Sequence, residues 1–157
     1  MKAATVKEIK IELNNKSHQE ILNLCLRLSK FKKENKELLT YLLFEADNQE
    51  NFINNIKEEI DAQFKLINTK TFYFIKKSVR KILRRIKTYI RYSKNTETEV
   101  ELRLYFCYKL KNFDPPLKYN RVINNLYLRE KEAIKKRVST LHEDLQYDYK
   151  LELKELT

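Results

Sequence analysis

Glycine is absent from all 157 residues of the chain. The phosphate-binding loops of nucleotide enzymes and the nucleophile elbow of hydrolases need close backbone approach or a positive φ angle, which glycine supplies at least cost. The chain is therefore not expected to bind nucleotides or to activate a nucleophile through such loops. The lack of glycine also disfavours tight β-hairpins, and it favours helices joined by turns of Asn, Ser and Thr.

Cysteine and histidine are nearly as scarce, with two of each. Cys25 and Cys107 stand alone in apolar helical stretches, which predicts two buried thiols in a reducing compartment and no disulfide framework. Neither His18 nor His142 has the Glu-x-x-His spacing of di-iron bundles, and no His-Glu-x-x-His motif occurs. The four side chains could form a zinc site only if the fold brought them together, because none is paired in sequence. No metal and no cofactor is expected.

Long apolar runs are missing as well. The first residues, MKAATVKEIKIEL, carry a charge every two or three positions and lack the apolar core of a signal peptide. No stretch approaches the roughly 18 uninterrupted apolar residues of a membrane span. The sequence therefore predicts a cytoplasmic protein without a membrane span.

Apolar residues recur at helical spacing along almost the whole chain, with polar breaks between the expected helices. Three pairs with the Ser/Thr-x-x-Glu spacing of a capping box predict helix starts: Thr5 with Glu8, Ser17 with Glu20, and Thr96 with Glu99. These patterns predict an all-α fold, either a compact multi-helix bundle or a short α-α superhelix of about six to eight helices. No linker composition divides the chain, so a single domain over 1–157 is expected.

Two segments leave alternatives open. The alternation in VELRLYFCYKL, residues 100–110, is compatible with a strand, although the capping box before it and the lack of a hairpin partner favour a helix. The segment 119–156 forms either one long helix or two helices with a break near 139–142.

The charge of the chain is concentrated in one predicted helix, 69–93. Between residues 62 and 96 there are 11 Lys or Arg and no acidic residue, whereas the whole chain has a net charge of +11. The remainder is therefore neutral overall. The apolar stripe of this helix leaves one side to cations, which we call the basic face: Lys77, Arg80, Lys81, Arg84, Lys87 and Arg91.

A stripe of Lys and Arg attracts polyanions through counterion release, and Tyr73, Tyr89 and Tyr92 could stack on unpaired bases. The sequence thus favours a non-enzymatic binding module for nucleic acid. The alternative is an adaptor or regulatory protein that docks an acidic protein partner through the same face, and peripheral membrane association is a further one. Part of the face could instead pair within the fold, because residues 45–61 hold six acids and one lysine.

The densest polar and aromatic cluster lies near the C-terminus, with His142, Asp144 and Asp148 at its centre. Asp144 and Asp148 are one helical turn apart, so their carboxylates could share a cation or act as an acid/base pair. An enzyme or metal site around 142–148 is therefore a third hypothesis. Nothing nearby supplies a nucleophile or an oxyanion hole, so no catalytic residue is assigned and a non-enzyme is expected.

The stretches LCLRLSKFKKENKELLTYLLFEAD, residues 24–47, and TLHEDLQYDYKLELKEL, residues 140–156, resemble an uncharacterised family of small bacterial all-helical proteins. Together with the capping boxes and the basic helix, the resemblance covers nearly the full chain. It implies a bacterial, cytoplasmic protein and brings no assigned activity or catalytic residue.

Overall fold

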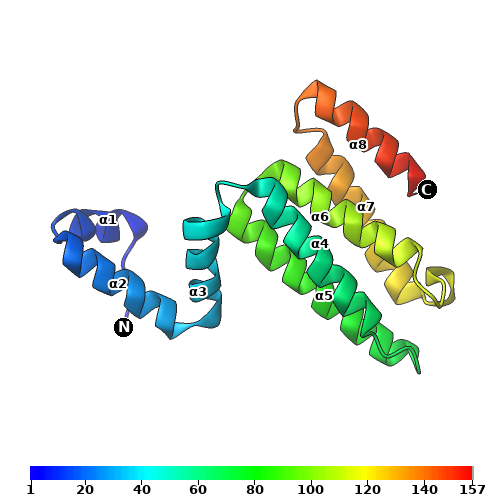
Figure 1. Ribbon diagram of the computed structural model, residues 1–157, viewed down its shortest axis with the longest axis horizontal. Coiled ribbons are helices and arrows are strands. Elements are labelled where there is room, and N and C mark those ends of the chain that lie inside the picture. Colours follow the sequence, from blue (N-terminus) through cyan, green and yellow to red (C-terminus); the bar gives the residue numbers. More distant parts are fainter. Residues whose placement is uncertain (157) are drawn as a thin grey trace. The chain divides into compact units, whose positions relative to one another are not determined.

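The computed structural model describes residues 1–156, which form eight α-helices and contain no β-strand (Figure 1). The all-α prediction is confirmed. The bounds are α1 Val6–Asn14, α2 His18–Phe31, α3 Lys33–Thr40, α4 Gln49–Lys65, α5 Phe72–Ser93, α6 Thr96–Lys111, α7 Arg121–Val138 and α8 Glu143–Glu155, with a π-helical turn at Tyr41–Glu45 and a 3₁₀ turn at Leu117–Tyr119. The last segment forms two helices, so of the two alternatives left open by the sequence the one with a break near 139–142 is correct.

The contacts divide the chain into two units, Met1–Phe44 and Glu45–Thr157. The N-terminal unit holds α1, α2 and α3, and the C-terminal unit holds α4 to α8. The expectation of one domain over the whole chain stays a prediction. Across residues 1–156, no helix combines the length and the apolar character that a bilayer span requires.

Two of the three expected capping boxes are present. In α1 the backbone N–H of Glu8 donates to Thr5 Oγ1 at 3.3 Å, and Thr5 N–H donates to Glu8 Oε2 at 2.7 Å. Ser17 and Glu20 make the same reciprocal pair at the start of α2. Each box satisfies two backbone donors that the first helical turn would otherwise leave without a partner.

The third expected box, at the start of α6, is wrong. Asn95 is the N-cap of this helix, and its Oδ1 accepts from Thr98 N–H at 3.0 Å, whereas Thr96 is already the first helical residue. The Glu99 carboxylate takes part in ion pairs with Arg103 and Arg137 instead of turning back to the helix start. Asn at the N-cap serves the same purpose as Thr, and the helix begins one residue earlier than the predicted box implied.

The core of the C-terminal unit is built around α6, which contacts α4, α5 and α7, while α8 packs on α7 (Figure 1). Because α6 has neighbours on several sides, it is buried around most of its circumference, with the large side chains of Leu102, Phe106 and Leu110 fully enclosed. This burial explains why residues 100–110 lack a clear helical stripe. The prediction of a helix over a strand is confirmed.

The N-terminal unit has almost no core. Tyr41 is the one buried side chain among residues 1–44, all of which the structure describes. The sequence predicted that Cys25 would be buried, and this is wrong because its thiol is exposed. Helix α2 has α3 as its principal contact, and the apolar side chains of Ile21, Leu24 and Leu28 stay exposed. Cys107 is buried, as predicted.

Candidate nucleic-acid interface

One side of helix α5 packs in the core of the C-terminal unit, and the other side faces solvent. Thr71 caps its start by accepting from Phe74 N–H at 3.5 Å. Ile75, Val79, Ile82 and Ile86 recur at intervals of three and four residues and are buried in the C-terminal unit. The opposite side of the helix is therefore held outward by the same packing that holds its apolar side inward.

All six residues of the basic face are exposed on this outer side of α5. Arg80, Arg84, Lys87 and Arg91 line one shallow, open depression of about 470 Å³, together with Leu83 and Thr88. The distance along the helix axis from Lys77 to Arg91 is about 21 Å, at about 1.5 Å per residue. The fold thus arranges the cations in one continuous row.

Four cations of the row have no acidic partner. Lys77, Arg80, Lys81 and Arg84 form no ion pair with any residue of the described range 1–156. Lys87 differs, because its Nζ lies 2.9 Å from Oε1 of Glu130 on α7. The row therefore presents a concentrated positive charge that the described part of the fold leaves available to an anion.

Two acidic side chains of α4, Glu59 and Asp61, pair with residues that do not belong to the basic face. Glu59 lies 3.6 Å from Arg85 Nε and accepts from the Tyr89 hydroxyl, so Arg85, at the margin of the basic face, provides the pairing that the sequence suggested. Asp61 accepts from Tyr105 at 2.7 Å and from Lys109 at 3.0 Å.

The charge state of Asp61 follows from these contacts. Burial raises the pKa of Asp61, but the hydrogen bonds from Tyr105 and Lys109 and the charges of Lys109 and Lys65 together lower it below its usual value, so this carboxylate stays charged. The hydrogen-bond and ion-pair partners of Asp61 lie on α6 and not on the basic face.

Lys87 belongs to an ionic network, centred on two buried carboxylates, that joins α5, α6 and α7. Glu130 binds Lys87 on one side and the Arg103 guanidinium on the other. Arg103 also binds Glu99 at 2.8 Å, and Arg137 Nε lies 3.0 Å from the second oxygen of Glu99. Glu99 and Glu130 are buried, so each carboxylate needs these partners to offset its loss of hydration. The network holds the basic helix in position.

The tyrosines expected to stack on bases lie in different environments. Tyr73 is exposed at the first turn of α5, in line with Lys77 and Arg80. Tyr92 is buried, and the Arg85 guanidinium lies 4.3 Å from the ring centroid of Tyr89. Burial and the Glu59 carboxylate raise the pKa of Tyr89. Of the three, Tyr73 alone is placed to meet a base.

The polar cluster near the C-terminus is open to solvent. The side chains of His142 and Asp144 are 77% and 93% exposed, with Nδ1 and Oδ2 3.4 Å apart, and Asp148 is exposed on α8. Within residues 1–156 no three His, Cys, Asp or Glu side chains are grouped closely enough to hold a metal ion. The side chains of this cluster are therefore surrounded mainly by solvent.

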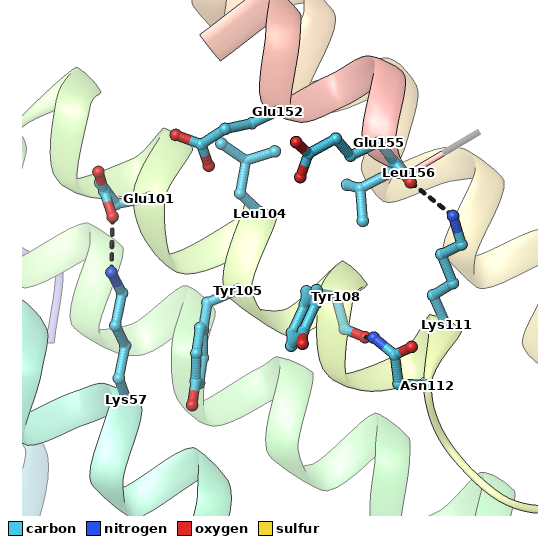
Figure 2. A pocket seen from close by; sticks show the side chains of 10 residues that line it. All are labelled: Lys57, Glu101, Leu104, Tyr105, Tyr108, Lys111, Asn112, Glu152, Glu155 and Leu156. Atoms are coloured by element: carbon cyan, nitrogen blue, oxygen red, sulfur yellow. Dashed lines mark hydrogen bonds and ion pairs between the residues drawn. The ribbon is translucent and has the colours of Figure 1, made fainter. Parts of the chain in front are cut away.

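A separate pocket of about 480 Å³ lies between α4, α6 and α8 (Figure 2). Lys57 Nζ and Glu101 Oε2 form an ion pair of 2.7 Å at one end, and Lys111 donates to the backbone carbonyl of Glu155 at the other. Burial, followed by the Glu101 carboxylate, raises the pKa of Glu152. The lining includes no Ser, Thr, Cys or His. These residues are far apart in sequence, so no motif could have indicated the pocket.

No protein-family model, curated protein or solved structure matches the chain. The resemblance to small bacterial helical proteins therefore stays a prediction.

Proposed function

We propose that the chain is a non-enzymatic binding module that holds nucleic acid on the basic face of α5. One observation carries the proposal: Lys77, Arg80, Lys81 and Arg84 lie exposed on the outer side of a helix, without an ion pair in the described chain. Cations in such a row bind phosphates chiefly by releasing condensed counterions.

The shape of the row fits a phosphate backbone. A length of about 21 Å corresponds to roughly six base-pair steps of about 3.4 Å each. The guanidinium groups of Arg80 and Arg84, one turn apart, can each donate two parallel hydrogen bonds to a phosphate. The row is built from side chains that contact phosphates well and carries no array of groups that would distinguish bases.

Base stacking makes a smaller contribution in this proposal. Tyr73 can stack on a base at one end of the row, while Tyr92 is enclosed in the fold. Proteins that prefer single strands usually combine a basic groove with several exposed aromatic side chains. Contacts to the phosphates of a duplex therefore account better for this surface, and sequence-tolerant binding is expected.

Fluorescence anisotropy with labelled duplex DNA, single-stranded DNA and single-stranded RNA tests the proposal at low and physiological salt. Four phosphate contacts predict a slope of log K against log salt of about −3.6 for a duplex and about −2.8 for a single strand. The double variant Arg80→Glu/Arg84→Glu should weaken binding at least tenfold, because it removes two cations and adds two repelling carboxylates.

The matched control is Lys150→Glu/Lys154→Glu on α8, which changes the net charge equally at two exposed positions outside α5. This variant should keep most of the affinity. Equal losses in both variants would mean that net charge alone causes binding, and no binding at low salt would overturn the proposal. Binding of polyglutamate in preference to every nucleic acid would favour the acidic protein partner instead.

A further inference from the structure

The N-terminal unit exposes an unusual amount of apolar surface. Fourteen Val, Ile, Leu and Phe side chains between residues 6 and 44 are exposed, whereas 24 of the 25 buried hydrophobic residues in the described chain lie at or beyond position 52. The side chains of Phe31 and Phe44 are 77% and 76% exposed. Scattered apolar residues are normal on a surface, but a density of this kind marks an interaction site.

Helices α1 and α3 of this unit are too short to be stable without further packing, and α2 is at the limit. Helices α1, α2 and α3 have 9, 14 and 8 residues, and isolated helices below about 12 to 15 residues are marginal in water. Capping boxes secure the starts of α1 and α2, but stability of a helix in a protein comes mainly from covering its apolar side. The unit therefore needs a partner surface.

The same unit carries both a groove and protruding side chains. The groove lies between α2 and α3, has a volume of about 280 Å³, and is lined mainly by Cys25, Leu28, Leu38 and Leu42. The amide of Asn35, which also borders it, already donates to the Leu28 carbonyl at 2.9 Å. The groove is therefore suited to bind apolar side chains and not hydrogen-bonding groups.

We propose that a second copy of the chain covers this surface, so that two N-terminal units pack against each other in a symmetric dimer. The 14 side chains, with exposed fractions from 36% to 85%, together present an apolar area on the order of 1,000 Å² over the unit. A stable dimer interface needs about 800 Å² from each partner. In a two-fold contact, the protruding Phe31, Leu43 and Phe44 of one copy can fill the groove of the other, and the reverse contact follows by symmetry. A flat bilayer surface would leave the groove unfilled.

The charge of the unit gives the association a distinct salt dependence. Residues 1–44 contain nine Lys or Arg and five acidic residues, so two such units repel each other weakly. Added salt screens this repulsion and leaves apolar packing intact. Dimerisation should strengthen with salt, whereas nucleic-acid binding weakens, so the two proposals can fail independently.

Sedimentation velocity of the full chain over a range of concentrations tests the proposal. A reversible monomer–dimer equilibrium is expected, and Leu28→Glu/Leu42→Glu should weaken dimerisation at least tenfold because it buries carboxylates in the groove. The matched control is Leu128→Glu/Leu151→Glu, which makes the same change at exposed positions of α7 and α8 and should leave the equilibrium unchanged. A wild-type chain that stays monomeric at all concentrations would overturn the proposal.

Maleimide labelling of the wild-type chain gives a second test, and its result does not depend on whether the variants fold. Cys25 borders the groove, so its labelling should slow as the protein concentration rises, and Cys107 should stay unlabelled because it is buried. Protection of Cys25 that is independent of concentration would mean that the same chain covers the groove. Fast labelling at all concentrations would mean that no second copy does. Either result would overturn the proposal.

Discussion

Lys94 ends α5 in a left-handed backbone conformation, with φ 49° and ψ 22°. It is the one residue among 1–156 with a positive φ, and its N–H still donates to the Ile90 carbonyl at 3.1 Å. A residue with a Cβ atom in this conformation costs roughly 1–2 kcal/mol, and glycine avoids that cost. The chain contains no glycine, so a lysine occupies the position.

Lys94→Gly should therefore raise the free energy of unfolding by about 0.5–1 kcal/mol, since the relief of the left-handed strain exceeds the greater freedom of glycine in the unfolded chain. Urea denaturation followed by circular dichroism measures the change. Lys94→Ala is the control, because it removes the charge and keeps the Cβ atom. Equal stabilisation by both variants would contradict the backbone explanation.

At the scale of single residues, the sequence predicted which side of a helix a residue occupies better than what covers that side. The basic face could be found because six cations share one helical stripe. Its pairing with Glu130, 43 positions after Lys87, depends on how α7 packs and has no local signal. The same limit applies to Cys25 and Cys107, which have similar sequence surroundings and opposite burial.

At the scale of elements, the junction between α5 and α6 shows how neighbouring signals compete. Asn95 and Thr96 are both good N-cap residues, and the capping-box spacing favoured Thr96 in the sequence. In the structure, Glu99 is close enough to Arg103 and Arg137 to form ion pairs, which removes the reciprocal half of that box. The sequence therefore predicted that helix α6 forms, but it did not predict which residue caps its start.

The N-cap assignment can be checked by two substitutions. Asn95→Ala should lower the free energy of unfolding by about 1 kcal/mol, because Thr98 N–H loses the acceptor that now lies at 3.0 Å. Thr96→Ala should change it by no more than about 0.5 kcal/mol, since Ala is favourable inside a helix. Thermal and urea denaturation of both variants measure the difference. A larger loss for Thr96→Ala would show that Thr96 caps α6 after all.

At the scale of the whole molecule, several weak acids of the C-terminal unit are held in the protonated form. Burial, followed by the Asp61 carboxylate, raises the pKa of Tyr105 to about 12, and burial raises the pKa of Cys107 to about 12. Burial and nearby carboxylates also raise the pKa of Tyr149, whose hydroxyl donates to Glu101 at 3.1 Å. In the unfolded chain these groups lose their protons at lower pH, near 9.0 for Cys and 10.0 for Tyr.

The native state therefore binds more protons than the unfolded state in alkaline solution, and stability must fall as the pH rises. The stabilisation is fully present below pH 9 and should decline from there to about pH 12. Urea midpoints measured across this interval test the decline, and the ultraviolet absorbance of tyrosinate should appear together with unfolding. Tyr149→Phe should make the decline shallower. A constant midpoint up to pH 12 would contradict the expectation.

The overall architecture was the most predictable property, because helical spacing and missing glycine both act along the whole chain. The contrast between the two units was not predictable. Apolar stripes of similar quality occur in α2 and in α4, but only the second is enclosed by neighbouring helices. Periodicity records that a helix has an apolar side and contains no information on how many neighbours will cover it.

The near absence of buried side chains in the N-terminal unit has a consequence for heat capacity. Unfolding raises the heat capacity of a protein mainly by exposing apolar surface to water. In a monomer, residues 1–44 already expose most of theirs, so the heat-capacity change of unfolding must come almost entirely from α4 to α8. In a dimer, the same residues would add their share at the step in which the two copies separate.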